Sequence, residues 1–110
     1  MEFETAIRHN IPLVVVIGND QGWGMVRHAQ QLKLGHVIEE STVIGKINYQ
    51  NLVKELGGEA FYVDKASEIR PTLEKAFATA KVACINVMTD PEPISPGSMA
   101  LAQIGGYAPE

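Results

Sequence analysis

Residues 13–24 read LVVVIGNDQGWG, and this stretch decides which fold the sequence predicts. Its first part, Leu13 to Ile17, is an unbroken apolar run rich in β-branched side chains, which is typical of a parallel strand covered on both faces. Its second part, Gly18 to Gly24, brings an amide, a carboxylate and flexible glycines to the point where a helical pattern begins. Open α/β sheets place their ligands at such strand-to-helix turns, so the stretch also suggests a binding site.

Helices and strands alternate along the rest of the chain. Apolar spacing and capping residues predict helices over 2–10, 25–34, 48–56 and 67–80, and further strands over 60–63 and 82–88. Strands separated by helices predict right-handed crossovers, and therefore an α/β fold with a parallel sheet and helices on both faces. The segment 35–47 has no clear period, so we expect it to be irregular, and an irregular segment of this length is more often functional than a mere linker.

The same spacing predicts which side chains face the core. The expected inward positions are Val26, Ala29 and Leu32 in 25–34, Tyr49, Leu52, Val53 and Leu56 in 48–56, and Ile69, Leu73, Ala76, Phe77 and Ala80 in 67–80.

Three strands make a thin sheet whose edges need cover, and the chain opens on a helix that no strand precedes. We therefore expect residues 1–90 to form a partial domain that is truncated at its amino end. Residues 91–110 are rich in proline and glycine and are expected to form an arm that docks elsewhere, in which only 99–104 suits a helical turn.

Composition narrows the class of protein. The chain has 110 residues, 45% of them hydrophobic and 20% charged, which is typical of one small soluble domain. A net charge of −4 with scattered basic residues gives no face for nucleic acid, and no apolar run is long enough to span a membrane. The amino end lacks a secretory signal, so we expect a cytoplasmic protein. Cys84 is the single cysteine, and its apolar neighbours predict a buried, unreactive thiol.

The turn after the first strand carries groups that suit a metal-bound phosphate. The side-chain oxygens of Asn19 and Asp20 are the type of ligand that Mg prefers. Gly22 and Gly24 allow a close approach of the backbone, and the amides that open the next helix favour an anion. The same residue types also dominate ordinary tight turns, and on spacing alone a plain turn is the more frequent interpretation.

The sequence resembles thiamine-diphosphate-dependent enzymes in their carboxyl-terminal, diphosphate-binding domain. The resemblance is carried by ETAIRHNIP at 4–12 and, after the apolar run, by GNDQGWG at 18–24. Three later parts of the chain also fit the family. The first is 49–58 followed by FYV at 61–63, the second is 68–77, which begins EIRP, and the third runs from INV at 85–87 to Asp90 and Pro91. The similarity spans nearly the whole chain and is to the branch of acetolactate synthase, benzaldehyde lyase, benzoylformate decarboxylase and the 2-hydroxyacyl-CoA lyases.

In that family a metal-binding signature opens with Gly-Asp-Gly and closes, a couple of dozen residues later, with Asn-Asn. The resemblance places Asn19 and Asp20 at the closing pair, so that Asp20 takes the side-chain ligand position for Mg and Gly22 the backbone-carbonyl position. Aspartate in place of asparagine keeps an oxygen ligand but adds a negative charge, which favours Mg and opposes diphosphate.

The residues that follow are expected to line the cofactor. Trp23, Gly24 and Met25 stand at positions that run beside thiamine diphosphate in similar enzymes, and the resemblance implies that they contact it together with Asn19, Asp20 and Gly22. For Trp23 and Met25, ordinary packing remains the alternative, because such side chains mostly serve packing.

A second departure from the family is larger. No Gly-Asp-Gly precedes residue 1, and the glutamate that activates the cofactor comes, in the family, from a separate domain that this chain does not resemble. We therefore expect no catalytic residue within the chain. The resemblance implies the carboxyl-terminal portion of a larger, homo-oligomeric enzyme that needs its missing upstream part.

The expected function is that of a thiamine-diphosphate- and Mg-dependent lyase, decarboxylase or acetolactate synthase-like transferase. Such an enzyme makes or breaks carbon–carbon bonds in small 2-oxo acids or 2-hydroxyacyl substrates. The alternative is a noncatalytic α/β fragment or interaction module without cofactor, which the missing Gly-Asp-Gly favours.

Other polar residues have plainer interpretations. His9, His28 and His36 lack the spacing of a helical metal pair and are expected to be surface or capping residues. The adjacent Glu39 and Glu40 point apart and predict a solvated loop, while Asp90 before Pro91 is typical of a turn.

Overall fold

The fold was analysed in a computed structural model that describes residues 2–104. The chain divides into two compact units. The first comprises residues 2–19 and 47–89, and the second comprises residues 20–46 with the described part of the segment that begins at Asp90. The division falls between Asn19 and Asp20, inside the stretch that decides the fold.

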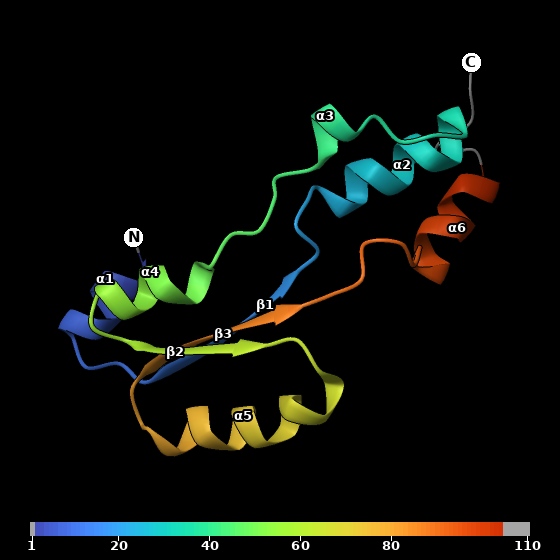
Figure 1. The fold of residues 1–110 in the computed structure, drawn as a ribbon. Coiled ribbons are helices and arrows are strands. Elements are labelled where there is room, and N and C mark those ends of the chain that lie inside the picture. Colours follow the sequence, from blue (N-terminus) through green and yellow to red (C-terminus); the bar gives the residue numbers. More distant parts are fainter. Residues whose placement is uncertain (1, 105–110) are drawn as a thin grey trace. The chain divides into compact units, whose positions relative to one another are not determined.

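The first unit is built on a parallel three-stranded sheet (Figure 1). Its strands are β1 (Leu13–Asn19), β2 (Glu59–Val63) and β3 (Val82–Met88), in the order β1-β3-β2. The register aligns Val16 of β1 and Phe61 of β2 with Ile85 of β3. The prediction of an α/β fold with a parallel sheet is confirmed, and β3, the most apolar strand, lies at the centre.

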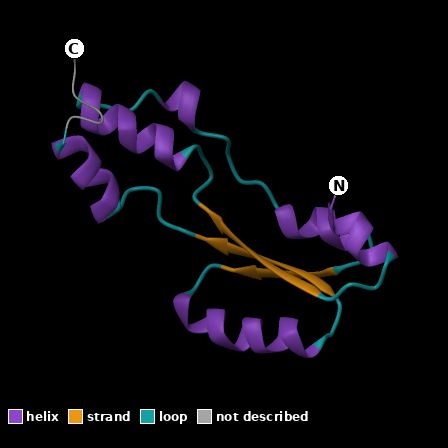
Figure 2. Ribbon diagram, turned by 180° about the vertical axis from the view of Figure 1, so that it is seen from behind, coloured by secondary structure: helices purple, strands orange, loops and turns teal. Residues whose placement is uncertain are grey.

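Helices cover both faces of this sheet. Helices α1 (Glu2–Arg8) and α4 (Tyr49–Glu55) lie on one face and α5 (Ala66–Ala78) lies on the other, as both ribbon views show (Figures 1 and 2). Strand β3 alternates between two apolar clusters. Val82 and Cys84 join Ala6 and Val53 on the first face, whereas Ala83 and Ile85 join Val63 and Ala76 on the second.

Helices α4 and α5 present narrower apolar faces than their spacing predicts. Val53 and Ala76 are buried, but Leu52 is 61% exposed and Phe77 is 68% exposed, so the prediction that both face the core is wrong. Ile69 is also exposed, and Ala80 lies beyond the end of α5 with a φ of 50°. The apolar face expected from the spacing is wide enough to pack on a broad surface. A sheet of three strands offers each helix only a narrow surface, so the outer residues of that face stay exposed.

The second unit contains α2 (Gly24–Leu34), α3 (Glu39–Thr42) and α6 (Pro96–Gln103). The irregular segment expected at 35–47 therefore includes a short helix, and the arm includes a longer helix than the turn expected at 99–104. Ser95 explains the earlier start of α6, because its Oγ accepts a hydrogen bond from the Ser98 amide at 3.1 Å and Pro96 follows it.

Helix α2 has no fully buried residue, and Val26, one of its expected inward positions, is exposed. Ala29 and Leu32 are half-buried. No helix in residues 2–104 combines the length and apolar character needed to cross a bilayer.

A buried amide ties the sheet to the chain that leads into α4. Asn86 of β3 is fully buried, and its Nδ2 donates to Gln50 Oε1 at 2.8 Å and to the Ile47 carbonyl at 3.3 Å. The Ile47 carbonyl also accepts a hydrogen bond from Asn19 Nδ2 at 3.1 Å. Two strand amides therefore fix one carbonyl at the carboxyl ends of β1 and β3.

Replacing this amide should be costly for the first unit. We expect Asn86→Ala to lower the free energy of unfolding by about 2 kcal/mol, because Gln50 Oε1 is left buried without its donor. Urea denaturation followed by circular dichroism measures the change. Asn51→Ala, at an exposed position of α4, is the control and should stay within about 0.5 kcal/mol of the parent. Equal effects of the two substitutions would contradict the role given to Asn86.

Candidate functional site

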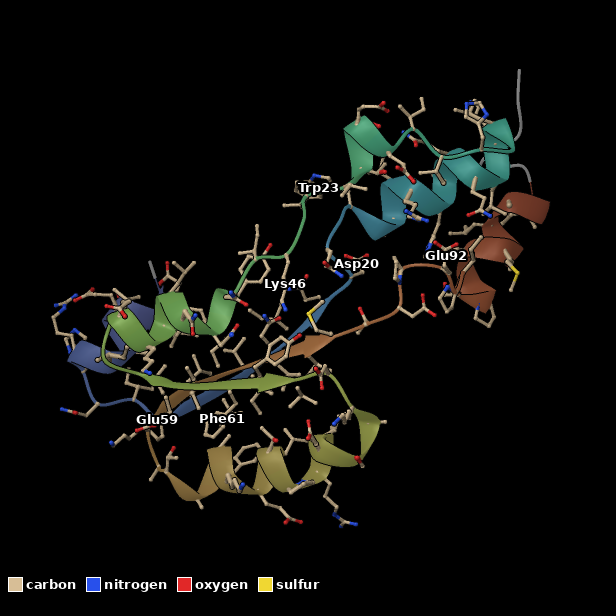
Figure 3. The ribbon with its side chains drawn as sticks, viewed as in Figure 1. Asp20, Trp23, Lys46, Glu59, Phe61 and Glu92 are labelled. Carbon is tan, nitrogen blue, oxygen red and sulfur yellow. The ribbon has the colours of Figure 1, made fainter. Side chains whose placement is uncertain are left out.

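The turn that follows β1 is fixed by the side chain of Asp20. Its Oδ1 accepts a hydrogen bond from the Gly22 amide at 3.0 Å, which closes a tight turn around Gln21. Gln21 itself has a φ of 61°, a left-handed conformation that few residues other than glycine adopt. Figure 3 shows Asp20 where the chain leaves β1 and Trp23 where it enters α2.

Gly22 lies against the segment that follows α3. An isolated antiparallel bridge pairs it with Val43, and two hydrogen bonds flank this bridge. The Trp23 amide donates to the Thr42 carbonyl at 2.8 Å, and the Ile44 amide donates to the Gln21 carbonyl at 2.9 Å. Neither bond uses the carbonyl of Gly22, which is the oxygen that the family resemblance assigns to Mg.

The two glycines of the turn differ in how strictly their surroundings require them, because Gly22 faces backbone whereas Gly24 faces a side chain that can rotate. A Cβ at Gly22 would lie 2.6 Å from the Thr42 carbonyl oxygen, and a Cβ at Gly24 would lie 2.2 Å from Asp20 Oδ2. The Asp20 carboxylate therefore occupies the position that any larger residue at 24 would take. The lack of a side chain at Gly24 allows the carboxylate to lie against the start of α2.

These groups line a pocket of about 210 Å³ that lies wholly within the second unit. Its walls include Asp20, Gly22, Gly24, Arg27 and Pro91. The pocket is smaller than the roughly 300–1,000 Å³ of sites that enclose a drug-sized ligand, and its size suits a small anion with a metal ion. A carboxylate, glycines and the start of a helix are suitable groups for that ligand.

Asn19 has a different place from the one expected for a cofactor contact. It belongs to the first unit, where its side chain is buried and donates to Ile47, while its carbonyl accepts from the Thr89 amide at 3.0 Å. These bonds give Asn19 a structural task at the end of β1. Its predicted contact with the cofactor stays a prediction.

Trp23 and Met25 are both exposed, the first by 61% and the second by 80%. The packing alternative considered for these side chains therefore does not hold within the described residues. Within the described residues, neither side chain is among those that line the pocket of Asp20, so their predicted contact with the cofactor stays a prediction.

No group of three or more histidine, cysteine, aspartate or glutamate side chains within residues 2–104 is arranged to hold a metal ion. Asp20 is thus the acidic ligand that the pocket itself offers. The expected ligand set of Asp20 and Gly22 would need further oxygens, which a bound diphosphate and water can supply.

The sequence interpretation gave no role in this site to several residues that line the pocket, which are Arg27, Thr42, Val43, Gly45 and Pro91. Arg27 lies one turn into α2, and Thr42 and Val43 come from the segment that was expected to be irregular. Arg27 follows Trp23 by four residues, so the helical period alone could have placed Arg27 on the same side of α2 as Trp23, near the start of the helix. No sequence signal indicates the bridge between Gly22 and Val43.

Other polar residues have structural roles. His28 Nε2 lies 3.0 Å from the Pro91 carbonyl, and the Asp90 carboxylate accepts a hydrogen bond from the Glu92 amide at 3.0 Å, as a turn residue does. His36 Nδ1 contacts the nearby Leu34 carbonyl at 3.2 Å. Cys84 is buried, and burial raises the pKa of its thiol, which keeps the thiol protonated and unreactive.

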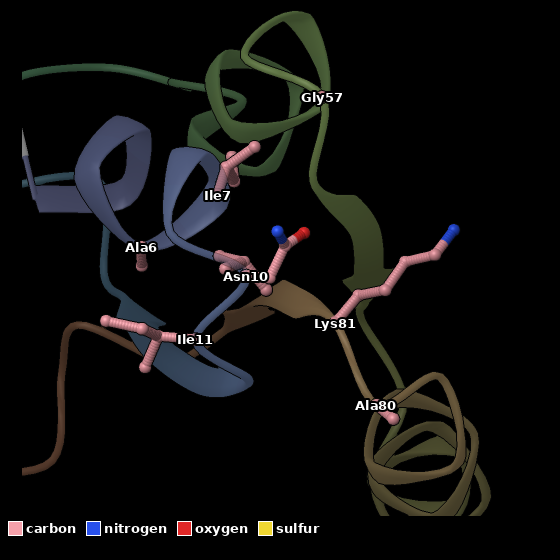
Figure 4. A pocket seen from close by; sticks show the side chains of 8 residues that line it. Ala6, Ile7, Asn10, Ile11, Gly57, Ala80 and Lys81 are labelled. Carbon is pink, nitrogen blue, oxygen red and sulfur yellow. The ribbon is translucent and has the colours of Figure 1, made fainter.

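A second pocket, of about 230 Å³, lies in the first unit at the amino ends of β1 and β3 (Figure 4). Ile7, Ile11, Asn10, Gly57 and Lys81 are among its lining residues. Parallel α/β sheets place ligands beyond the carboxyl ends of their strands, and this pocket lies at the opposite end. The pocket beside Asp20 is therefore the candidate site.

A substitution at Gly24 tests whether binding of Mg with a diphosphate depends on the position of the Asp20 carboxylate. Gly24→Ala should leave stability nearly unchanged but rotate Asp20 out of place, weakening binding of Mg with inorganic pyrophosphate about tenfold. The fluorescence of Trp23, the single tryptophan, reports the titration. Gly97→Ala is the control, because its Cβ would approach no atom closer than 3.9 Å. Unchanged binding by Gly24→Ala would show that the carboxylate is not needed.

Comparison with known proteins gives consistent matches. Residues 1–87 match the family model described as "Thiamine pyrophosphate enzyme, C-terminal TPP binding domain". A probable acetolactate synthase of Mycobacterium bovis is 38% identical over 102 residues, which are 93% of this chain and 18% of the relative. A 2-hydroxyacyl-CoA lyase of Arabidopsis thaliana is 30% identical over 95 residues, covering 83% of this chain and 17% of the relative. The chain thus spans less than a fifth of the length of these relatives.

Proposed function

Since this chain belongs to the thiamine pyrophosphate enzymes, as their C-terminal TPP-binding domain, we propose that the pocket beside Asp20 holds the diphosphate of that cofactor together with Mg. The observation that carries the proposal is the close approach of the Asp20 carboxylate and Gly24, inside a pocket of suitable size. Asp20 and the Gly22 carbonyl are the proposed protein ligands of Mg.

The chain's own residues would bind and orient the diphosphate end of the cofactor. The Asp20 carboxylate would offset part of the charge of the metal, and the unpaired amides that open α2 would suit the anion. Trp23 and Met25 flank the pocket-lining Gly24 in sequence and are exposed, and we propose that they contact the less polar part of the cofactor. When bound, thiamine diphosphate supplies a nucleophilic carbon and an electron sink.

For the reaction, we propose the making or breaking of carbon–carbon bonds in 2-oxo acids or 2-hydroxyacyl substrates. The names of the relatives, acetolactate synthase and 2-hydroxyacyl-CoA lyase, support this class of chemistry. We place no catalytic residue in this chain. The proposed partners are an upstream part of the same enzyme, which carries the opening Gly-Asp-Gly, and a second subunit, and the proposed compartment is the cytoplasm.

Calorimetry tests the proposal. Titration of the chain with thiamine diphosphate in the presence of Mg should give binding tighter than about 1 mM, and chelation of Mg should abolish it. Thiamine, which lacks the diphosphate, is the matched control and should not bind. Binding of thiamine that equals binding of thiamine diphosphate would contradict the proposal, as would the absence of any binding.

A further inference from the structure

Arg27 provides the positive charge of the candidate pocket. Arg27 lies on α2 one turn beyond Trp23, and its backbone amide donates a hydrogen bond to the Trp23 carbonyl at 2.9 Å. Arg27 lines the pocket together with Asp20 and Gly22. The Arg27 side chain is only 18% exposed. Arginine is well suited to phosphate groups, because its planar donors match two oxygens at once.

The donors of Arg27 are incompletely used. Nη2 forms an ion pair with Glu92, whose side chain is 63% exposed, while the buried Nε has no hydrogen-bond partner in the described part of the chain. A buried donor without an acceptor is costly unless a ligand supplies one. The exposure of Glu92 means that this acid can turn into solvent when a stronger anion arrives.

The charge of Asp20 gives a reason for a cation at this place. The Asp20 carboxylate lines the pocket, and its negative charge opposes a diphosphate there. Arg27 brings one positive charge to the walls of the same pocket and offsets this negative charge. Near the pocket, Glu92 and Asp90 are also acidic, and Asp90 is occupied in a turn with the Glu92 amide.

From these contacts we infer that Arg27 is a diphosphate-binding residue of this site and that Glu92 is the counter-ion it exchanges for the diphosphate. The inference rests on the proposed function, because it names a further residue of the same pocket. In the unliganded chain Glu92 holds the guanidinium beside the pocket. On binding, Nη2 would leave Glu92, and the guanidinium would donate to diphosphate oxygens.

The two members of the pair should act in opposite directions. Arg27→Ala should weaken binding of inorganic pyrophosphate with Mg at least about tenfold, whereas Glu92→Gln should tighten it about threefold, because the competing carboxylate is gone. Arg27→Lys should lie between the parent and Arg27→Ala, since lysine keeps the charge without the fork of donors. Arg70→Ala, which breaks an exposed ion pair with Glu74 on α5, is the control and should change nothing.

Trp23 fluorescence titrations with pyrophosphate and with thiamine diphosphate measure these changes, and thermal unfolding shows that each variant is folded. The inference is overturned if Arg27→Ala binds as the parent does. It is equally overturned if Glu92→Gln weakens binding as Arg27→Ala does, since the ion pair would then only stabilise the folded structure of this unit. In both cases binding by the parent chain would leave the proposed function standing, whereas a parent chain that binds neither ligand would contradict the proposed function itself.

Discussion

Asp20→Ala is expected to abolish the Mg-dependent binding of thiamine diphosphate. Asp20 is the acidic side chain of the pocket, its Oδ1 closes the turn through Gly22, and its Oδ2 lies against Gly24. Alanine removes both the proposed ligand and the hydrogen bond that shapes the turn. We expect the affinity to fall by about 100-fold or more, beyond detection in a millimolar titration, because even outer-shell groups cost about 10–100-fold.

Asp20→Asn separates the oxygen ligand from its charge. It keeps a side-chain oxygen for Mg and for the Gly22 amide, and it introduces the asparagine that the family resemblance predicts at this position. We expect it to bind within about tenfold of the parent, so that the loss in Asp20→Ala reports the missing side-chain oxygen and not the missing charge. If Asp20→Ala retains cofactor and Mg as the parent does, Asp20 is not the metal ligand.

Ile85→Ala is expected to have the largest effect on stability. Ile85 is 1% exposed at the centre of β3, where it packs with Val63, Ala76 and Ala83 beneath α5. Truncation leaves a cavity in a sheet of three strands, which has few other buried side chains to compensate. We expect a loss of about 2–5 kcal/mol in the free energy of unfolding.

Urea denaturation of the parent and the variant measures this loss. Leu52→Ala is the matched control, because it removes an apolar side chain of similar volume from the exposed face of α4 and should cost no more than about 0.5 kcal/mol. Similar losses for the two variants would contradict the core assigned to this unit.

The alternation of short elements allowed much of the fold to be predicted. Strand β3 has the predicted bounds, because its continuous apolar run is what a central parallel strand requires. The inward positions of α4 and α5 were predicted less well. Leu52 and Phe77 fit the helical period, but the period does not tell how wide a surface the sheet offers, and both are exposed.

The candidate site was predicted in part for a similar reason. Asp20, Gly22 and Gly24 are neighbours in sequence, so their common place in one pocket follows from a local turn. Thr42 joins them through a bridge between segments that are distant in sequence, and Arg27 is distinguished only by its buried Nε and its ion pair with Glu92. Such non-local contacts depend on packing, which spacing along the chain does not encode.

The measurement that tests the central claim most directly is a map of backbone amide chemical shifts of the isotope-labelled chain during titration with thiamine diphosphate and Mg. We predict that the largest changes occur at Gly22, Gly24 and Arg27, around the pocket beside Asp20. Changes centred instead on Asn10, Gly57 and Lys81, around the pocket at the opposite end of the strands, would contradict the site proposed for this domain.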